Sequence, residues 1–163
     1  MLIGITYLCE AFGNVPIVDR FDVPEGFLPE TSSREEVFAF IENSIKNNVD
    51  KLSDDTKTYY GRFNKWNAKM LLARLYLNAE SWIGKNMYTE CMALCTEIMN
   101  SNKYALENDY SAPFYAQNEG SQEIIFAYPA DEVKTGSTIY MALQKTLHPS
   151  NVKTFNLQTW LDN

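Results

Sequence analysis

The residues that could perform chemistry are few, and they do not combine into a catalytic site. The only histidine, His148, precedes Pro149 and has no serine or cysteine at a spacing typical of a nucleophile. Because a catalytic base needs a partner that orients it, a structural or surface role is the better interpretation of His148. The acidic residues that could cleave a glycosidic bond occur as adjacent pairs, which point apart on a helix. These pairs are Glu35-Glu36, Asp54-Asp55 and Asp131-Glu132.

Cysteine and glycine do not indicate a cofactor site either. Cys91 and Cys95 are four residues apart and would share a helix face, but zinc needs two further ligands. With Cys9 the count is odd, so no disulfide framework is expected, and Cys91 and Cys95 are interpreted as small apolar core residues. The glycines are isolated, and none forms a phosphate-binding loop. The sequence predicts no metal and no cofactor.

Aromatic side chains are the residues through which this chain could bind a ligand. Sugar rings present apolar C–H faces that stack on flat side chains, while their hydroxyl groups bond to polar neighbours. Tyr59 and Tyr60 lie in a polar loop, and Trp160, with Phe155 nearby, lies in a segment without core periodicity. These four are the candidate ligand-binding residues, and Trp160 is the best single candidate.

Composition excludes several classes of partner. The chain has the size of one domain, at 163 residues, and its 45% hydrophobic content is enough to form a core. The net charge is −7, and no run of Lys or Arg could follow a phosphate backbone, so nucleic acid is an unsuitable partner. The acidic balance gives no attraction to an anionic membrane, and no apolar run approaches the ~20 residues of a membrane helix.

Three helices must position these residues. Apolar residues recur at helical period on one face over residues 34–52 and 86–100, which predicts two amphipathic helices. Over residues 62–80 they cover most of the circumference, Met70 and Leu77 included, which predicts a buried central helix. The expected structural core includes Trp66, Leu72, Tyr76, Trp82, Cys91 and Cys95.

The helix ends carry their own signals. Two serine–glutamate pairs have the spacing of a capping box at the start of helix 34–52. They are Ser32 with Glu35 and Ser33 with Glu36. Residues 1–11 are interpreted as the end of a helix that stops at Gly13, with Pro16 just beyond. A chain that starts within a helix is expected to be a piece of a longer protein.

The last two helices form an antiparallel pair that resembles a tetratricopeptide unit. Leu72, Ala73 and Tyr76 match the core of the first helix of that repeat. Lys69 stands where the repeat has Trp, so the unit is degenerate. The N-terminal helix and helix 34–52 are expected to form a second unit.

Beyond these helices the chain becomes irregular. Residues 124–128 are expected to form a short strand that Pro129 ends. We expect residues 1–110 to be a helical-repeat region and residues 111–163 to be the start of a loop-rich subdomain, together one incomplete domain. The predicted fold class is mostly α, with tetratricopeptide-like repeats, a short strand and an irregular segment.

Five short motifs follow one another in a distinctive order and spacing. They are residues 12–18 (FGNVPIV), 61–62 (GR), 66–82 (WNAKMLLARLYLNAESW), 101–106 (SNKYAL) and 123–127 (EIIFA). In this arrangement they resemble the SusD/RagB family, surface lipoproteins of Bacteroidetes that capture glycans for an outer-membrane transporter. The resemblance covers most of residues 7–128.

The resemblance implies a SusD-like fold and a non-enzymatic role in nutrient uptake and polysaccharide utilisation. It implies a glycan as ligand, a TonB-dependent SusC-like transporter as partner, and a surface-exposed place on the outer membrane. The parent protein would touch the membrane only through a lipid anchor upstream of this chain. The motifs are scaffold signatures and carry over no glycan-contacting residue. A tetratricopeptide-type adaptor that binds a peptide or protein stays the alternative, and an enzyme with its catalytic part outside this chain is a third.

Overall fold

The computed structural model describes residues 2–58, 61–115 and 117–128. Contacts divide the chain into Met1–Ala127 and Tyr128–Asn163, and the first unit is the one described here. Its elements are α1 (Leu2–Phe12), β1 (Val15–Pro16), β2 (Thr31–Ser32), α2 (Arg34–Lys46), the 3-10 turn η1 (Val49–Lys51), α3 (Lys65–Leu77), α4 (Ala79–Ile83), α5 (Tyr88–Asn100) and the 3-10 turn η2 (Ala112–Phe114). The domain boundary expected after residue 110 stays a prediction.

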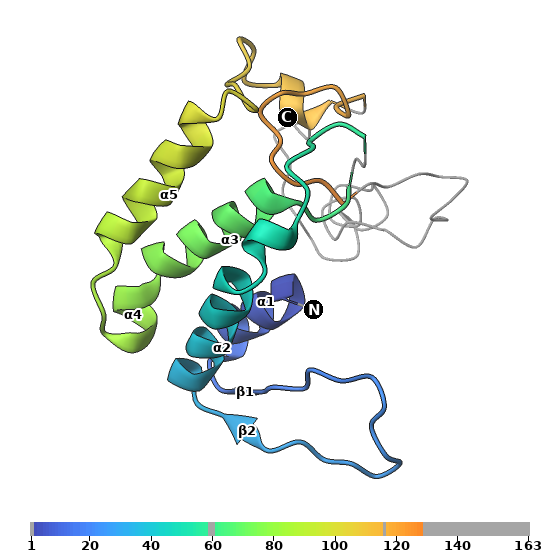
Figure 1. Ribbon diagram of the computed structural model, residues 1–163, viewed down its shortest axis with the longest axis vertical. Coiled ribbons are helices and arrows are strands. Elements are labelled where there is room, and N and C mark those ends of the chain that lie inside the picture. The colour runs from blue at the N-terminus through green and yellow to red at the C-terminus, as the bar shows by residue number, and fades with distance from the viewer. Residues whose placement is uncertain (1, 59–60, 116, 129–163) are drawn as a thin grey trace, which may run out of the picture. The chain divides into compact units, whose positions relative to one another are not determined.

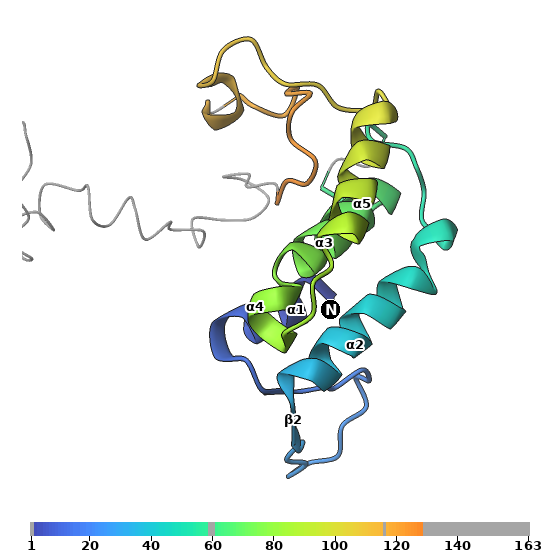
Figure 2. The ribbon, with the colours of Figure 1, turned by 90° about the vertical axis from the view of Figure 1, so that its left-hand side faces the viewer.

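The helices pack on one another in chain order. α1 contacts α2, α2 contacts α3, and α3 makes its most extensive contact with α5. Figures 1 and 2 both show α3 between α5 and the pair of α1 and α2. The mostly helical, repeat-like fold class predicted from the sequence is confirmed.

A tight turn links α1 to β1. Gly13 ends the helix at φ +74°, where its N–H donates to the Cys9 carbonyl oxygen at 2.9 Å. The side chain of Asn14 accepts from the Arg34 N–H at 2.9 Å, and the Arg34 guanidinium lies over the Trp82 ring. β1 and β2 pair antiparallel, and the loop between them projects away from the helices (Figure 1). The sequence did not predict this short β pair.

The start of α2 carries one of the two predicted capping boxes. Ser33 accepts from the Glu36 N–H, and the Glu36 carboxylate accepts from the Ser33 N–H at 2.7 Å. The helix is shorter than the predicted 34–52, because it ends at Lys46. Asn48 then leaves helical geometry at φ −125°, and the chain continues as the 3-10 turn η1.

The predicted helix 62–80 is two helices in the structure. The side chain of Asn64 accepts from the N–H groups of Trp66 and Asn67, so α3 begins after Asn64 and not at residue 62. Asn78 closes α3 and precedes the short helix α4. Asparagine competes for backbone hydrogen bonds in this way, which favours helix ends over interiors.

α3 contributes much of the core but is not buried all round. The fully buried side chains include Leu75 of α3 and its neighbours on α1 and α2. Met70 and Leu77, however, are 43% and 57% exposed, which corrects the prediction that apolar burial surrounds most of this helix. Lys69 is buried on α3, where it forms an ion pair with Glu97 of α5. None of the described helices is long and apolar enough to cross a membrane.

The strand predicted at residues 124–128 does not form. No strand runs beside this segment in the described part of the chain, so its backbone has no ladder to join. Individual hydrogen bonds hold this segment instead. The Asn67 side chain donates to the Ile125 carbonyl oxygen, and the Ala105 N–H donates to the Gln122 carbonyl oxygen at 3.1 Å.

Candidate functional site

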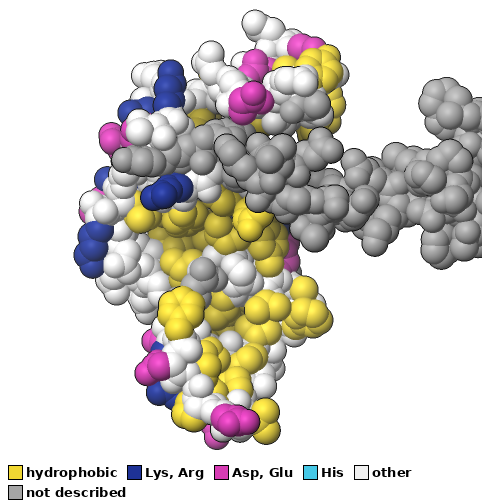
Figure 3. Space-filling view, turned by 90° about the vertical axis from the view of Figure 1, so that its right-hand side faces the viewer, with side chains coloured by type: hydrophobic (Ala, Val, Ile, Leu, Met, Phe, Trp, Pro, Cys, Tyr) yellow, Lys and Arg dark blue, Asp and Glu magenta, His cyan; other side chains and the backbone are white. Residues whose placement is uncertain are grey.

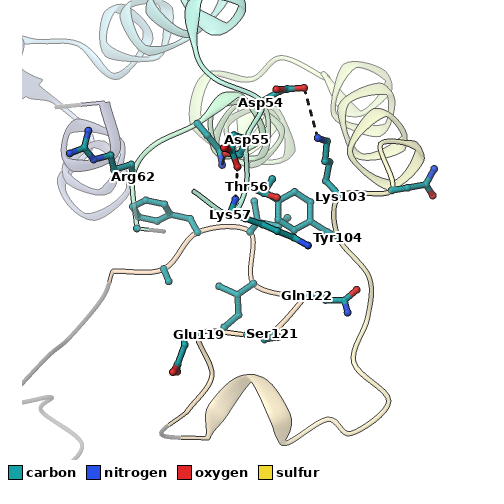
Figure 4. A pocket seen from close by; sticks show the side chains of 18 residues that line it. Asp54, Asp55, Thr56, Lys57, Arg62, Lys103, Tyr104, Glu119, Ser121 and Gln122 are labelled. Atoms are coloured by element: carbon teal, nitrogen blue, oxygen red, sulfur yellow. Dashed lines mark hydrogen bonds and ion pairs between the residues drawn. The ribbon is translucent and has the colours of Figure 1, made fainter. Parts of the chain in front are cut away.

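A polar cleft of about 950 Å³ opens where three segments of the chain meet (Figure 4). The first wall is the connection from η1 to α3, the second is the turn after α5, and the third is the segment that follows η2. We call this site the polar cleft. It is lined by residues 54–57, 61, 62, 64, 102–104, 119–122 and 124–127.

Backbone hydrogen bonds shape the first wall. The Asp55 carboxylate accepts from the N–H groups of Lys57 and Thr58, at 2.8 and 3.0 Å. A hydrogen bond from the Thr58 side chain, together with these two backbone bonds, lowers the pKa of Asp55 to about 2. The first turn of α3 holds this wall, since the Trp66 indole N–H donates to the Asp54 carbonyl oxygen at 3.2 Å.

The second wall centres on Tyr104. Asn102 takes a left-handed conformation at φ +54°, which turns the chain after α5 and brings Lys103 and Tyr104 into the cleft. The Tyr104 hydroxyl is buried beside Asn64 and has no hydrogen-bond partner among the described residues. Burial raises the pKa of Tyr104, and the neighbouring Asn64 side chain offsets part of that effect. Lys103 Nζ lies 3.9 Å from Asp54 Oδ2 (Figure 4).

The third wall is tied to the loop after α5. Glu107 accepts from the Ser121 hydroxyl and from the Gln122 N–H, each at 2.8 Å. Phe126 packs edge-on against Phe63, with ring centroids 6.2 Å apart. This wall therefore presents polar groups from residues 119–122 and apolar ones from residues 124–127.

An apolar groove of about 560 Å³ lies apart from most of the cleft lining. It is formed by side chains of α1, α3 and α5 and by residues 123–126. Tyr7, Met70 and Leu77 line it and are about half exposed. Figure 3 shows a face of the molecule on which hydrophobic side chains gather broadly. Cys91 and Cys95 also line the groove, and burial together with the neighbouring Cys95 raises the pKa of Cys91.

The polar cleft presents hydrogen-bonding groups and aromatic rings along its lining. Three acidic and three basic side chains line it, so their net formal charge is zero. They are Asp54, Asp55 and Glu119 with Lys57, Arg62 and Lys103. No three His, Cys, Asp or Glu side chains of the described residues are placed to hold a metal ion.

The four candidate ligand-binding residues predicted from the sequence lie outside the described residues. They are Trp160, Phe155, Tyr59 and Tyr60, and His148 is outside as well. Of the predicted core residues, Trp66, Leu72 and Tyr76 are buried. Trp82, Cys91 and Cys95 are partly buried.

The cleft itself was missed by the sequence reasoning. Tyr104 belongs to one of the motifs, but its neighbours in space are about 50 residues earlier and 20 residues later in the chain. The signal in the sequence that could have indicated the cleft was an aromatic residue, Tyr104, directly after the polar turn of residues 101–103.

Comparison with known proteins gives a consistent set of relatives. No protein-family model matches the sequence. The chain is 29% identical over 142 residues to the starch-binding protein SusD of Bacteroides thetaiotaomicron, an alignment that covers 83% of this chain and 25% of SusD. The chain therefore spans about a quarter of the length of this relative.

Solved structures share the fold. A SusD-like carbohydrate-binding protein from Bacteroides fragilis superposes with a TM-score of 0.64 at 20% identity, over 77% of this chain and 24% of that one. Surface glycan-binding protein A from Bacteroides uniformis gives 0.62 at 21% identity, over 77% and 28%. A SusD superfamily protein from Bacteroides vulgatus gives 0.55 at 25% identity, over 69% and 24%. The chain is thus SusD-like in its fold and similar to SusD in its sequence, which confirms the resemblance seen in its motifs.

Proposed function

We propose that this chain is part of a non-enzymatic, cell-surface protein that binds oligosaccharide and delivers it to a TonB-dependent outer-membrane transporter. The observation that carries the proposal is the 29% identity to the starch-binding protein SusD over 83% of the chain. Two structural neighbours named as glycan-binding or carbohydrate-binding proteins support the same class of ligand.

Reversible capture fits the chemistry of the described residues. Asp55 is held by three neighbouring groups of its own loop, and the raised pKa of Cys91 keeps its thiol protonated. Binding by stacking and a few hydrogen bonds gives weak affinity, about millimolar to micromolar, or roughly 4–8 kcal/mol. Weak binding lets a transporter take the ligand over, and the parent protein would be held at the outer membrane by a lipid anchor.

The test is affinity electrophoresis of the parent protein, with this chain in parallel, in gels that contain soluble starch, xylan, mannan or levan. We expect at least one polysaccharide to retard the protein, with no release of reducing sugar and no effect of a metal chelator. Purification of the tagged parent protein from outer membranes should also recover a TonB-dependent transporter. Migration unchanged in every gel, together with no transporter recovered, would refute the proposal.

The apolar groove favours a second candidate, a tetratricopeptide-type adaptor. Helical-repeat proteins bind peptides in grooves between their helices, and the lining of this groove is apolar and partly exposed. The adaptor proposal predicts that Met70→Ser with Leu77→Ser abolishes binding of a protein partner. Under the glycan-binding proposal, the same double variant migrates like the wild type in polysaccharide gels.

A further inference from the structure

We propose that the polar cleft is a subsite for a neutral sugar, one or two rings of an oligosaccharide held against the Tyr104 ring. The inference rests on the proposed function and extends it, because it names the place and the chemical class of the ligand within the described residues. Four observations support it: the charge of the cleft, its aromatic surface, its free polar groups and its size.

The charge of the lining favours a neutral ligand. The charges of the three acidic and three basic side chains in the cleft add up to zero. The Asp55 carboxylate accepts hydrogen bonds from its own loop, and Asp54 Oδ2 pairs with Lys103 Nζ at 3.9 Å. A phosphate or uronate would meet as many acids as bases here, so no net attraction would draw it in.

The ring of Tyr104 is partly buried. Its hydroxyl is buried and has no hydrogen-bond partner among the described residues, so the packing of the ring positions it. The ring is partly exposed on the cleft side, where Figure 4 shows it between the first and third walls. Phe126, braced by Phe63, adds a second apolar surface to the lining. A sugar ring stacks its C–H face on surfaces of this kind.

Polar groups beside the ring are free to bind hydroxyl groups. Both backbone groups of Gln122 are hydrogen-bonded: its N–H donates to the Glu107 carboxylate, and its carbonyl oxygen accepts from the Ala105 N–H. Its exposed side-chain amide makes no hydrogen bond to the described residues, and it offers both donors and an acceptor. The side chain of Asn102, also exposed, makes a single long hydrogen bond within the described part of the chain, of 3.4 Å to the Asn100 carbonyl oxygen.

The cleft is large enough for one or two sugar rings, or for one end of a longer ligand. Its volume of about 950 Å³ lies at the upper end of ligand pockets, which span roughly 300–1,000 Å³. The apolar groove is smaller, and most of its lining is aliphatic and aromatic, so it offers fewer partners for the hydroxyl groups of a sugar.

The test is a titration of the full chain with neutral oligosaccharides and with oligogalacturonate, in which calorimetry and ligand-observed NMR measure the affinity. We expect Tyr104→Leu and Gln122→Ala to weaken binding of a neutral oligosaccharide by about fivefold or more, the effect of one lost stacking or hydrogen-bond contact. Tyr104→Phe, which keeps the ring, should stay within about twofold of the wild type. Tyr110→Leu is the matched control, because Tyr110 is 85% exposed and does not line the cleft.

Each outcome decides the subsite separately from the proposed function. Unchanged affinity in both Tyr104→Leu and Gln122→Ala overturns the subsite while sugar binding by the chain stands. Binding of oligogalacturonate alone overturns the neutral class. If the chain binds no sugar, the subsite is overturned, and the electrophoresis of the parent protein decides the proposed function. Melting temperatures are compared throughout, and if Tyr104→Leu does not fold, Gln122→Ala decides.

Discussion

Truncation of Leu72 measures how central α3 is to the fold. The side chain is 6% exposed and belongs to the core cluster formed with α1 and α2. Leu72→Ala removes three carbon atoms, worth about 0.8 kcal/mol each, or about 2.4 kcal/mol in transfer free energy. The cavity that remains adds to this loss, so we expect the free energy of unfolding to fall by about 3–4 kcal/mol, inside the range of about 2–5 kcal/mol for such substitutions.

Urea denaturation followed by far-UV circular dichroism gives the free energy of unfolding. Leu77→Ala is the matched control, since it makes the same chemical change in the same helix at a side chain that is 57% exposed. Its cost should be below about 1 kcal/mol, because little apolar surface returns to water. A loss below about 1 kcal/mol for Leu72→Ala, or equal losses for the two variants, would refute the placement of α3 at the centre of the core.

Four further predictions follow from single contacts. Gly13→Ala should cost about 1–2 kcal/mol in thermal unfolding, because Gly13 lies at φ +74°. Glu97→Ala should destabilise more than Lys69→Met in urea unfolding, because it leaves the buried Lys69 cation unpaired, whereas methionine fills the site without charge. The lowered pKa of Asp55 adds stability above its unfolded pKa of about 4, which is lost as pH falls toward about 2, so Asp55→Asn should flatten acid unfolding in that window. Asn67→Asp, which keeps the helix cap but loses the amide donor to the third wall, should speed amide hydrogen exchange in residues 124–127; unchanged exchange would contradict the bond.

Features of the fold that depend on neighbours in sequence were predictable. The capping box of Ser33 and Glu36 and the left-handed stop at Gly13 each lie within four residues of the groups they satisfy. The helix pattern of residues 86–100 likewise became α5, with its boundary moved by two residues. Local hydrogen bonds and apolar periodicity decide such features before any tertiary contact forms.

Features that depend on distant segments were not predictable. The apolar run at residues 124–128 lacks a strand beside it, and a strand exists only as part of a pair. The apolar residues Met70 and Leu77 looked like core, yet they line an open groove. Periodicity gives the face of a helix that is apolar, but it does not show what covers that face.

The candidate site illustrates the same limit. The sequence pointed to Tyr59, Tyr60, Phe155 and Trp160 because they are aromatic residues without core periodicity, and these positions stay predictions. The ring that the structure places in the polar cleft, Tyr104, stood in a helix-exit motif and looked like scaffold. Its place in the cleft depends on segments that converge only after folding.

The first turn of α3 explains why a scaffold motif and a cleft coincide. The side chains of Asn64, Trp66 and Asn67 each serve a helix or core role, and each also reaches a cleft wall. Asn64 and Trp66 donate to the backbone of the 54–55 segment in the first wall, while Asn67 donates to Ile125 in the third. The second wall follows α5, and the ion pair between the buried Lys69 and the exposed Glu97 fixes α5 to α3 one turn further along. Loops without regular structure are thereby set against one another by a single helix, which would lower the ordering cost of the proposed binding of a sugar between them.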